Sequence, residues 1–293
     1  MNADPMNADP MNTSSTDAGS TDAGSTTSAG PPTAEPPAAG PPVAGLLAGR
    51  NAVIYGGGGT IGGAVARAFA RAGAMVHLAG RTGGPLDQVA GEIRAAGGSA
   101  ATAVLDGLDE RAVDEHADAV VAAEGRLDIS VNLISNDVLQ GTPLAEMTAE
   151  DVEQPVHIAL RSTFLTCRAA ARHMIRQRSG VILMFGGYGD PVPRVGGLQI
   201  AFGAIEALRR ALACELGPHG IRVLTLQTGG IPESLPAGFP GGQAISDAIE
   251  GRTMLGRAAT LADVGNVAVF AASDLARSMT ATALNITAGA VVD

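Results

Sequence analysis

The 293-residue sequence contains no lysine, and its 19 basic residues are all arginine. Tryptophan is also absent, and cysteine and tyrosine occur twice each. Without lysine the chain cannot form a lysine Schiff base, a P-loop phosphate clamp or a tyrosine–lysine proton relay, because each needs that amine or ammonium group. Two cysteines are too few for a disulfide-stapled fold. Cys167 and Cys214 fall in helical patterns among small apolar neighbours, which predicts reduced thiols in a core.

Positive charge is scarce relative to negative charge, and the formal net charge is −10. The arginines are dispersed and form no basic stripe, so we expect no nucleic-acid partner. No run approaches the roughly 20 apolar residues that span a bilayer, so we expect no membrane partner either. The first basic residue is Arg50, so the basic start of a secretory signal is missing and a cytoplasmic location is expected.

Residues 1–45 hold hardly any large apolar side chain. They repeat Met-Asn-Ala-Asp-Pro twice and Ser-Thr-Asp-Ala-Gly twice before a series of Pro-Pro pairs. Such a composition cannot bury enough apolar surface to offset the entropy of ordering, which predicts a disordered tail. The remaining residues, 46–293, fit one α/β domain, a class that can reach about 250 residues.

From Leu46 onward, short apolar runs alternate with longer helical patterns. The runs at 52–55, 75–79, 103–105, 129–131, 181–185, 223–226 and 283–286 predict seven strands. Helical periodicity covers 61–69, 109–124, 151–177, 198–216 and 261–273. This alternation predicts a doubly wound, Rossmann-like fold with a parallel sheet and helices on both faces. Such folds bind ligands at the carboxyl ends of their strands.

A glycine-rich segment, residues 55–62, follows the first strand and opens the first helix. Glycines let the backbone approach a pyrophosphate, and the amides at the start of a helix attract the anion. The segment fits both Gly-x-Gly-x-x-Gly from Gly57 and Gly-x-x-x-Thr-x-Gly from Gly56, so its register stays open. A turn that only packs a helix on a strand is the alternative; the strand before and helix after favour dinucleotide binding.

The second strand ends in Ala79-Gly80-Arg81-Thr82. An acidic residue here would bind the ribose 2′-hydroxyl of NAD, whereas a basic one accommodates the 2′-phosphate of NADP. Because Arg81 is present and no acid is, NADP(H) is favoured over NAD(H). Arg81 could alternatively be a solvated loop residue.

From Leu46 to Asp293 the sequence resembles the short-chain dehydrogenase/reductase family. The segment 56–62 is similar to its Thr-Gly-x-x-x-Gly-x-Gly motif, with Tyr55 and Thr60 as departures, and Asn132 stands at its Asn-Asn-Ala-Gly. The resemblance implies a nicotinamide cofactor and a small-molecule substrate. The cofactor-binding set that we expect is Gly56, Gly57, Gly59, Thr60, Ile61, Gly62, Arg81, Asp106, Asn132, Gly229 and Ile231. In that set the resemblance implies that Asp106 meets the adenine and the backbone of Ile231 meets the nicotinamide amide.

The family's proton-transfer residues are an Asn, a Ser and a Tyr-x-x-x-Lys, and all four are missing at the matching positions. The Asn position falls on Ala159, the Ser position on Gly186-Gly187, the Tyr position on Leu198 and the Lys position on Phe202. The resemblance therefore implies a divergent member without the usual tetrad. A replacement proton donor is conceivable in the segment 188–194, where Tyr188 could pair with Arg194; a solvent-facing loop is the alternative.

Three functions remain open. We favour an NADP(H)-dependent oxidoreductase with a non-standard or impaired proton-transfer site, because hydride chemistry belongs mainly to the cofactor. The alternatives are a non-redox enzyme on the same fold, such as an isomerase or cyclase, and a catalytically inactive NADP-binding protein. His116 and His173 fall on polar helix positions, and no histidine pair has metal-ligand spacing, so no metal is expected. The resemblance also implies a homo-oligomer, a dimer or tetramer, joined through helices 151–177 and 198–216.

Overall fold

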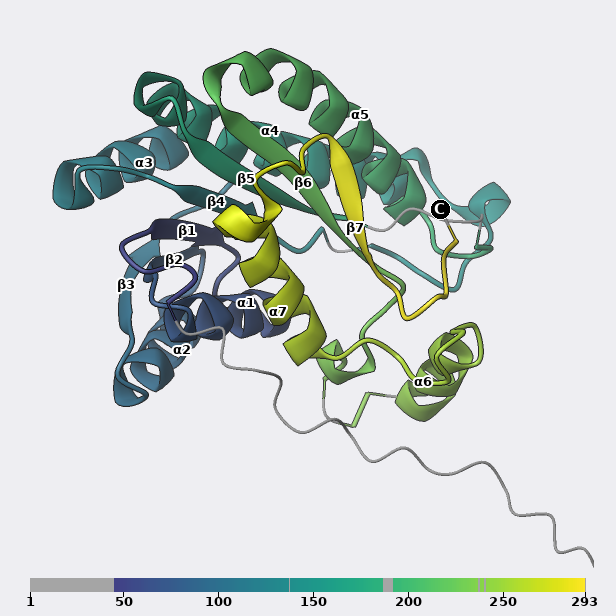
Figure 1. The fold of residues 1–293 in the computed structure, drawn as a ribbon. Helices are drawn as coiled ribbons and strands as arrows, with labels where there is room; N and C mark the ends of the chain where they lie inside the picture. The colour runs from purple at the N-terminus through teal and green to yellow at the C-terminus, as the bar shows by residue number, and fades with distance from the viewer. Residues whose placement is uncertain (1–44, 137, 187–191, 237, 240, 293) are drawn as a thin grey trace, which may run out of the picture. The chain divides into compact units, whose positions relative to one another are not determined.

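A seven-stranded parallel sheet runs through the fold in the order β3-β2-β1-β4-β5-β6-β7 (Figure 1). The structure is a computed structural model that describes residues 45–292 except 137, 187–191, 237 and 240. The strands are β1 (Asn51–Tyr55), β2 (Met75–Gly80), β3 (Ser99–Val104), β4 (Ile129–Asn132), β5 (Gly180–Gly186), β6 (Ile221–Thr228) and β7 (Thr282–Ile286). All neighbouring strands pair in parallel, which confirms the predicted doubly wound, Rossmann-like class.

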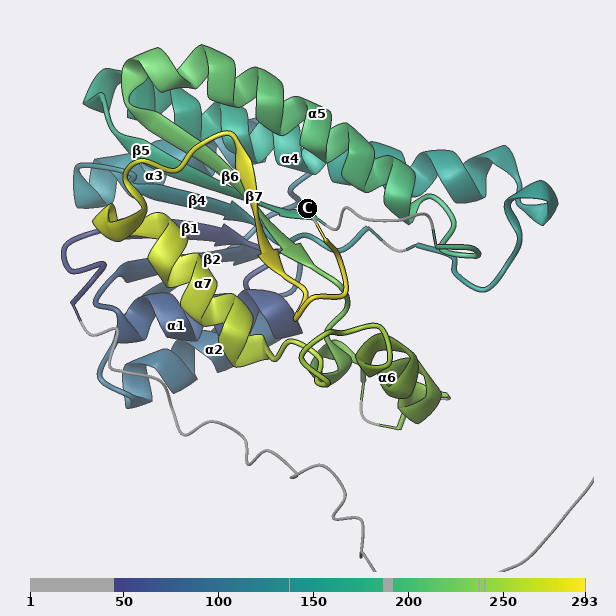
Figure 2. The ribbon, with the colours of Figure 1, turned by 45° about the vertical axis from the view of Figure 1, so that its right-hand side comes forward.

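Helices cover both faces of this sheet. They are α1 (Thr60–Arg71), α2 (Gly83–Ala95), α3 (Glu110–Glu124), α4 (Ala149–Gln177), α5 (Leu198–Leu216), α6 (Gly242–Glu250) and α7 (Leu261–Ala272), with 3₁₀ turns at η1 (Leu144–Glu146), η2 (Gly217–His219), η3 (Pro232–Ser234) and η4 (Asp274–Ala276). Helices α1, α2 and α7 lie on one face and α3, α4 and α5 on the other (Figures 1 and 2). Each face buries its own hydrophobic cluster, which explains why the central strands are apolar on both sides.

Three elements differ from the sequence-based expectation. Strand β3 begins at Ser99, four residues before the expected start, because its first half consists of small, partly exposed residues at a sheet edge. Helix α2 was not predicted. It begins with Gly-Gly-Pro, residues that disfavour a helix in a sequence-based prediction, although Leu86, Val89 and Ile93 follow with helical spacing. Helix α6 was not predicted either, and none of its residues is buried.

The expected disordered tail, residues 1–45, lies outside the described residues apart from Gly45. Among the helices of the described chain, none is long and apolar enough to cross a membrane.

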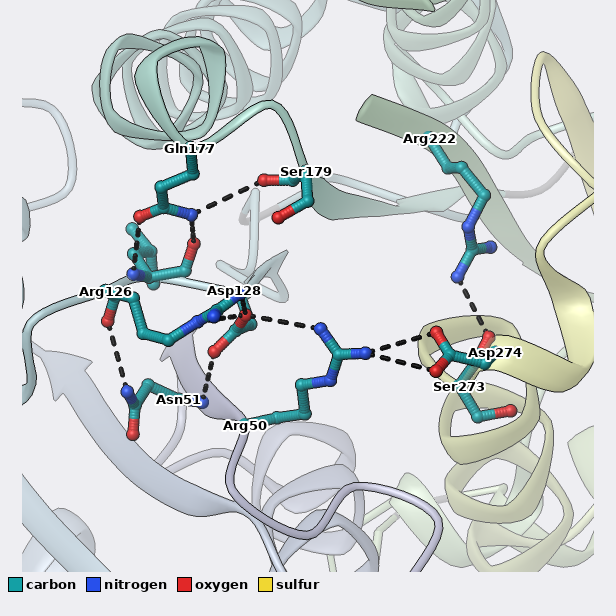
Figure 3. Close-up of polar contacts among 10 residues, drawn as sticks. Arg50, Asn51, Arg126, Asp128, Gln177, Ser179, Arg222, Ser273 and Asp274 are labelled. Atoms are coloured by element: carbon teal, nitrogen blue, oxygen red, sulfur yellow. Dashed lines mark hydrogen bonds and ion pairs between the residues drawn. The ribbon is translucent and has the colours of Figure 1, made fainter. Parts of the chain in front are cut away.

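A polar network fixes the amino ends of the strands (Figure 3). Buried Asp128 accepts a hydrogen bond of 2.9 Å from the Asn51 amide and one of 2.7 Å from Arg126 Nε. Arg50 contacts Asp128 at 3.4 Å and also donates to Asp274 at 3.1 Å. The starts of β1 and β4 are thereby joined to the turn after α7. Because a buried carboxylate is stable only with such partners, this end of the sheet is held in one arrangement.

Aromatic and imidazole side chains fill the space between β1, β2 and α3. The ring of Tyr55, the last residue of β1, is fully buried and meets His116 of α3 edge-on, with centroids 5.9 Å apart. His77 of β2 is also buried, and its Nε2 lies 3.4 Å from Glu124 without hydrogen-bond geometry. Burial lowers the pKa of His116 to about 4, and the neighbouring His77 lowers it further in the same direction.

We predict that the His116 imidazole makes the fold acid-sensitive. Its pKa is lowered on folding, so between about pH 6.5 and pH 4 the unfolded chain binds a proton that the native protein does not. The free energy of unfolding should therefore fall by about 3 kcal/mol as pH decreases through this window. In His116→Phe this part of the acid dependence should be lost in urea titrations.

His157→Phe is the control, because the His157 side chain on α4 is exposed and is in water in both states. If His116→Phe and the wild type lose stability in parallel between pH 6.5 and pH 4, the imidazole is not neutral in the native core.

Candidate active site

The glycine loop after β1 is hydrogen-bonded to the neighbouring strand β2 and lies beside the chain that follows β4. The Gly56 and Gly57 amides both donate to the Ala79 carbonyl of β2, at 2.8 and 3.2 Å, and the Leu133 amide after β4 donates to the Tyr55 carbonyl at 2.9 Å. Gly56 has φ +81°, and a Cβ there would overlap the Leu133 carbonyl. Only glycine combines this backbone conformation with so close an approach.

Close contacts inside the loop constrain several of its glycines. A Cβ on Gly62 would run into the Gly56 carbonyl, so the first turn of α1 packs directly on the start of the loop. The Gly56-x-x-x-Thr60-x-Gly62 register places its two glycines at these contacts. Gly59 is less constrained, since a Cβ there would have a single neighbour, the Gly56 carbonyl at 3.3 Å. Gly62 belongs to both registers, and a Cβ on Gly57 would lie 2.8 Å from Leu78, so the close contacts fall on glycines of both registers.

The start of α1 presents free amide groups beside this loop. The first intrahelical hydrogen bond runs from the Gly63 amide to the Gly59 carbonyl at 2.7 Å, so the amides of residues 60–62 precede it. Gly59 caps the helix without a side chain, and the first turn holds no acidic residue. Exposed Thr60 adds a hydroxyl, whereas Ile61 packs against the core. This end of α1 suits an anion such as a pyrophosphate.

Arg81 and Asp106 follow β2 and β3 at the same edge of the sheet. Arg81 is exposed and makes no hydrogen bond or ion pair with any residue that the structure describes. Asp106 is also exposed, and its Oδ1 accepts a 3.0 Å bond from the Leu108 amide, which turns the chain toward α3.

Asn132, the last residue of β4, is buried and fully engaged with the protein. Its Nδ2 donates to Thr166 at 3.1 Å and lies 3.4 Å from Ser162, both on α4, while its Oδ1 accepts from the Ile134 amide at 3.0 Å. The sequence did not indicate these partners on α4. Asn132 holds the segment after β4 in place, and any contact with a ligand would come from the backbone beside it.

Gly229 and Ile231 follow β6. A Cβ on Gly229 would come within 3.2 Å of Ala290, so the chain after β6 packs closely on the chain after β7. The Ile231 carbonyl accepts bonds from the amide and hydroxyl of Ser234, at 2.9 and 2.7 Å. Every member of the expected cofactor-binding set therefore lies at the carboxyl end of a strand or in the segment that follows it.

The positions that match the family's proton-transfer residues carry no titratable group. Ala159 is buried, Leu198 and Phe202 are half-buried, and a Cβ on Gly186 would lie 3.9 Å from the Phe202 ring. A cavity of about 10 Å³ adjoins Gly186 and Phe202 and is also lined by Glu206. Tyr188, the candidate proton donor, lies outside the described residues.

Two other expectations need correction. Cys214 was expected in the core but is exposed, whereas Cys167 is buried, and its burial raises the pKa of its thiol to about 12. His116 and His173 were placed on polar helix positions, yet His173 is buried and its Nε2 lies 2.8 Å from Asp118. Periodicity alone does not show which face of a helix another element covers: Asp118 of α3 meets His173 on α4, whereas Cys214 on α5 stays exposed. No group of three metal-ligating side chains occurs within the described ranges.

Comparisons with known proteins agree with this geometry. The model of the family described as enoyl-(acyl carrier protein) reductase matches residues 58–290. Gluconate 5-dehydrogenase of Gluconobacter oxydans is 28% identical over 229 residues, covering 78% of this chain and 89% of that protein. D-threitol dehydrogenase of Mycolicibacterium smegmatis is 30% identical over 247 residues, covering 83% and 93%. The structure of a short-chain type dehydrogenase/reductase from Mycobacterium ulcerans superposes with a TM-score of 0.77 at 27% identity, covering 83% and 90%.

The chain belongs to the short-chain dehydrogenase/reductase family, a family of oxidoreductases that bind nicotinamide cofactors. The match covers most of the chain, so the assignment rests on the whole fold as well as on the glycine loop.

We predict that Gly62→Ala destabilises the protein by about 1–3 kcal/mol, the usual cost of overpacking a tight contact. The added methyl group would collide with the backbone carbonyl of Gly56, which cannot move without disturbing the bonds to β2. Urea unfolding measures the difference. Gly91→Ala is the matched control: it lies mid-helix in α2 with nothing within 4 Å, and alanine there should stabilise by about 0.5–1 kcal/mol. Equal behaviour of the two variants would contradict the close approach.

Proposed function

We propose that this protein is an NADP(H)-dependent oxidoreductase whose proton-transfer site is non-standard or impaired. The observation that carries the cofactor choice is Arg81, an exposed guanidinium with no partner among the described residues, placed between the starts of α1 and α2. A free arginine at the end of the second strand suits a 2′-phosphate, and no acid in the segment 79–82 is available to bind a 2′-hydroxyl.

The start of α2 supports the same choice. Thr82 caps this helix without a side-chain hydrogen bond, and the first turn contains no acidic residue. Open space surrounds Gly84, and the nearest carboxylate on the helix, Asp87, is engaged by the Thr102 hydroxyl at 3.0 Å. The helix therefore offers amides and a positive end for a second phosphate, next to the Arg81 charge.

The glycine loop fits a dinucleotide. Gly56 and Gly62 allow the backbone to pack closely, and the amides of residues 60–62 precede the first intrahelical hydrogen bond of α1. We assign the pyrophosphate to this loop, the adenine to the neighbourhood of Asp106 and the nicotinamide amide to the backbone near Ile231. The Asn132 side chain acts by positioning the segment after β4.

A bound nicotinamide cofactor supplies the hydride equivalent. We call the carboxyl ends of β5 and β6, where the nicotinamide would lie, the reacting end. The chain's own residues there would position the nicotinamide and shield it from water: Leu198 and Phe202 contribute hydrocarbon, and Gly186 leaves room beside them. Among the described residues, Glu206 is the carboxylate that lines the cavity beside Gly186 and Phe202. Burial raises its pKa, but pairing with Arg209 and Arg210 outweighs burial and lowers the pKa, so it remains ionised. A proton for the product must therefore come from the substrate, from water or from Tyr188, to which we assign the catalytic role in this chain.

The same hydrocarbon favours a second candidate. A non-redox enzyme on this fold, or an inactive protein that binds NADP, needs no proton donor at positions 159, 186, 198 and 202. Binding of NADP with no turnover of any carbonyl compound would favour that candidate.

We also propose a homo-oligomer, a dimer or tetramer, joined through α4 and α5. Leu160 and Phe164 on α4 are 39% and 43% exposed, as an interface would require. Cys167 and Ala171, which continue the same stripe, are buried within the chain, so only the first half of the stripe is available to a partner.

We predict that Arg81→Ala weakens NADPH binding by about 10- to 100-fold, the size of one charge-assisted contact with a phosphate. The affinity for NADH should change by less than about twofold, because NADH lacks the 2′-phosphate. Fluorescence titration with each cofactor measures both. Arg71→Ala, at the far end of α1, is the control and should alter neither affinity. An equal loss for NADPH and NADH would remove the basis for the phosphate preference.

We predict that simple ketones and secondary alcohols turn over far more slowly than a tyrosine–lysine pair would allow, because no described side chain at the reacting end can donate a proton. Steady-state assays with NADPH or NADP test this. Residual activity should disappear in Tyr188→Phe if that phenol donates the proton. Brisk activity that survives Tyr188→Phe would overturn the assignment of Tyr188.

A further inference from the structure

Helix α6 carries an apolar side that the described chain covers only in part. Ile245 and Ile249 lie four residues apart and so share one side of the helix, while Asp247 and Glu250 lie on the other. Gln243 donates to Asp247 at 2.8 Å on the charged side. In a folded protein such a helix normally buries its apolar side. Here none of the nine residues is buried.

The apolar side of α6 is directed at the end of β6. A Cβ on Gly230, whose φ is +110°, would lie 2.8 Å from Ile249 Cδ1, so this isoleucine packs on the chain just before Ile231. Ile245 extends the same side and is 38% exposed, and Phe239, just before the helix, is 44% exposed. The exposed part of this side, Ile245 with Phe239, thus adjoins the position that we assign to the nicotinamide.

Two further apolar side chains lie at the same end of the sheet. Met254 would touch a Cβ on Gly289 at 2.7 Å, and the Leu255 amide donates to the Ala288 carbonyl at 3.1 Å. The segment 287–290 in turn packs on Gly229. Met254 and Leu255 are nevertheless 73% and 67% exposed. We call Phe239, Ile245, Met254 and Leu255 the apolar rim.

Polar side chains beside the rim are already committed to the backbone. The hydroxyls of Ser234, Ser246 and Thr253 donate to carbonyls of their own segments, at 2.7, 3.1 and 2.8 Å. The Glu233 carboxylate accepts from the Leu261 amide at 2.7 Å. A sugar or polyol against this surface would lose water from its hydroxyls without gaining these partners, which is costly.

The side opposite the rim is also hydrocarbon. Figure 2 shows the start of α5 and helix α6 on opposite sides of the carboxyl ends of β5 and β6. Leu198 and Phe202 belong to this part of α5, and the strand beneath them ends in Gly186. Both described sides of the reacting end are therefore apolar.

From this arrangement we infer that the substrate is an apolar molecule, a carbonyl compound or alcohol with a hydrocarbon chain, which covers the apolar rim when it binds. The inference rests on the proposed function for the identity of the site. The rim is continuous with that site, and burial of hydrocarbon against it supplies affinity in proportion to chain length. Specificity then comes from the lack of partners for a polar substrate.

The test is calorimetric binding of straight-chain 2-ketones with 4 to about 12 carbons to the NADPH-loaded protein. Affinity should rise about threefold to fourfold for each added methylene until the rim is covered. Threitol and gluconate should give no heat. In Ile245→Asp the dependence on chain length should vanish, while NADPH binding should persist unchanged.

Leu275→Asp is the matched control. Leu275 is 66% exposed, but it lies in η4, whose Asp274 contacts Arg50 at the amino ends of the strands. This variant should bind the ketones as the wild type does. Affinity that is independent of chain length, or an equal effect of both variants, would overturn the inference. So would a change of oligomeric state in Ile245→Asp, measured by sedimentation, because a second copy would then cover the rim.

The same series with the cofactor-free protein separates the two proposals. Chain-length-dependent binding without any NADPH binding would contradict the proposed function and leave the apolar site standing. Tight NADPH binding without ketone binding would contradict the apolar substrate site and leave the proposed cofactor binding standing.

Discussion

The backbone at the end of β1 is held by hydrogen bonds and close packing on both sides, and the candidate site depends on these contacts. The amides of Gly56 and Gly57 bond to β2, the Tyr55 carbonyl bonds to the chain after β4, and the first turn of α1 rests on the Gly56 carbonyl. No side chain larger than hydrogen fits at Gly56 or Gly62. The free amides of α1 are therefore held at one place, beside the ends of β2 and β4, and everything assigned to the cofactor is arranged around them.

The two ends of the sheet differ in whether their charged and apolar groups have partners within the protein. At the amino ends, buried Asp128 binds two arginines and a backbone amide, so charge is neutralised inside the protein and the strands are locked. At the carboxyl ends, Arg81 has no partner in the described chain and α6 leaves Ile245 on its apolar side exposed. An exposed arginine without a protein partner is available to bind a phosphate, and exposed hydrocarbon gains free energy when an apolar molecule covers it, which is why we propose these two ligands.

Cofactor binding and proton transfer depend on different groups of this fold, so one can be kept when apolar side chains replace the other. The frame that would hold a dinucleotide comes from backbone groups and one arginine, whereas proton transfer depends on individual side chains. Substitutions at Ala159, Leu198 and Phe202 can therefore remove the usual acid and base without disturbing the loop at 56–62. We propose that cofactor binding and an impaired proton-transfer site coexist in this chain, and that an apolar substrate site beside the rim accompanies the loss of the polar one.

The sequence by itself determined the class of fold, the order of the elements and the place of the loop, because a buried parallel strand is apolar on both faces and a glycine loop marks where the first strand ends. It also excluded a tyrosine–lysine pair, since lysine is absent throughout. Tertiary structure alone decided the close approach of Gly56 to the chain after β4, the engagement of Asn132 with α4, the burial of His173, and the contact of half-buried His116 with Tyr55. These outcomes depend on contacts between residues far apart in the chain, and local periodicity carries no information about which surface will cover a helix.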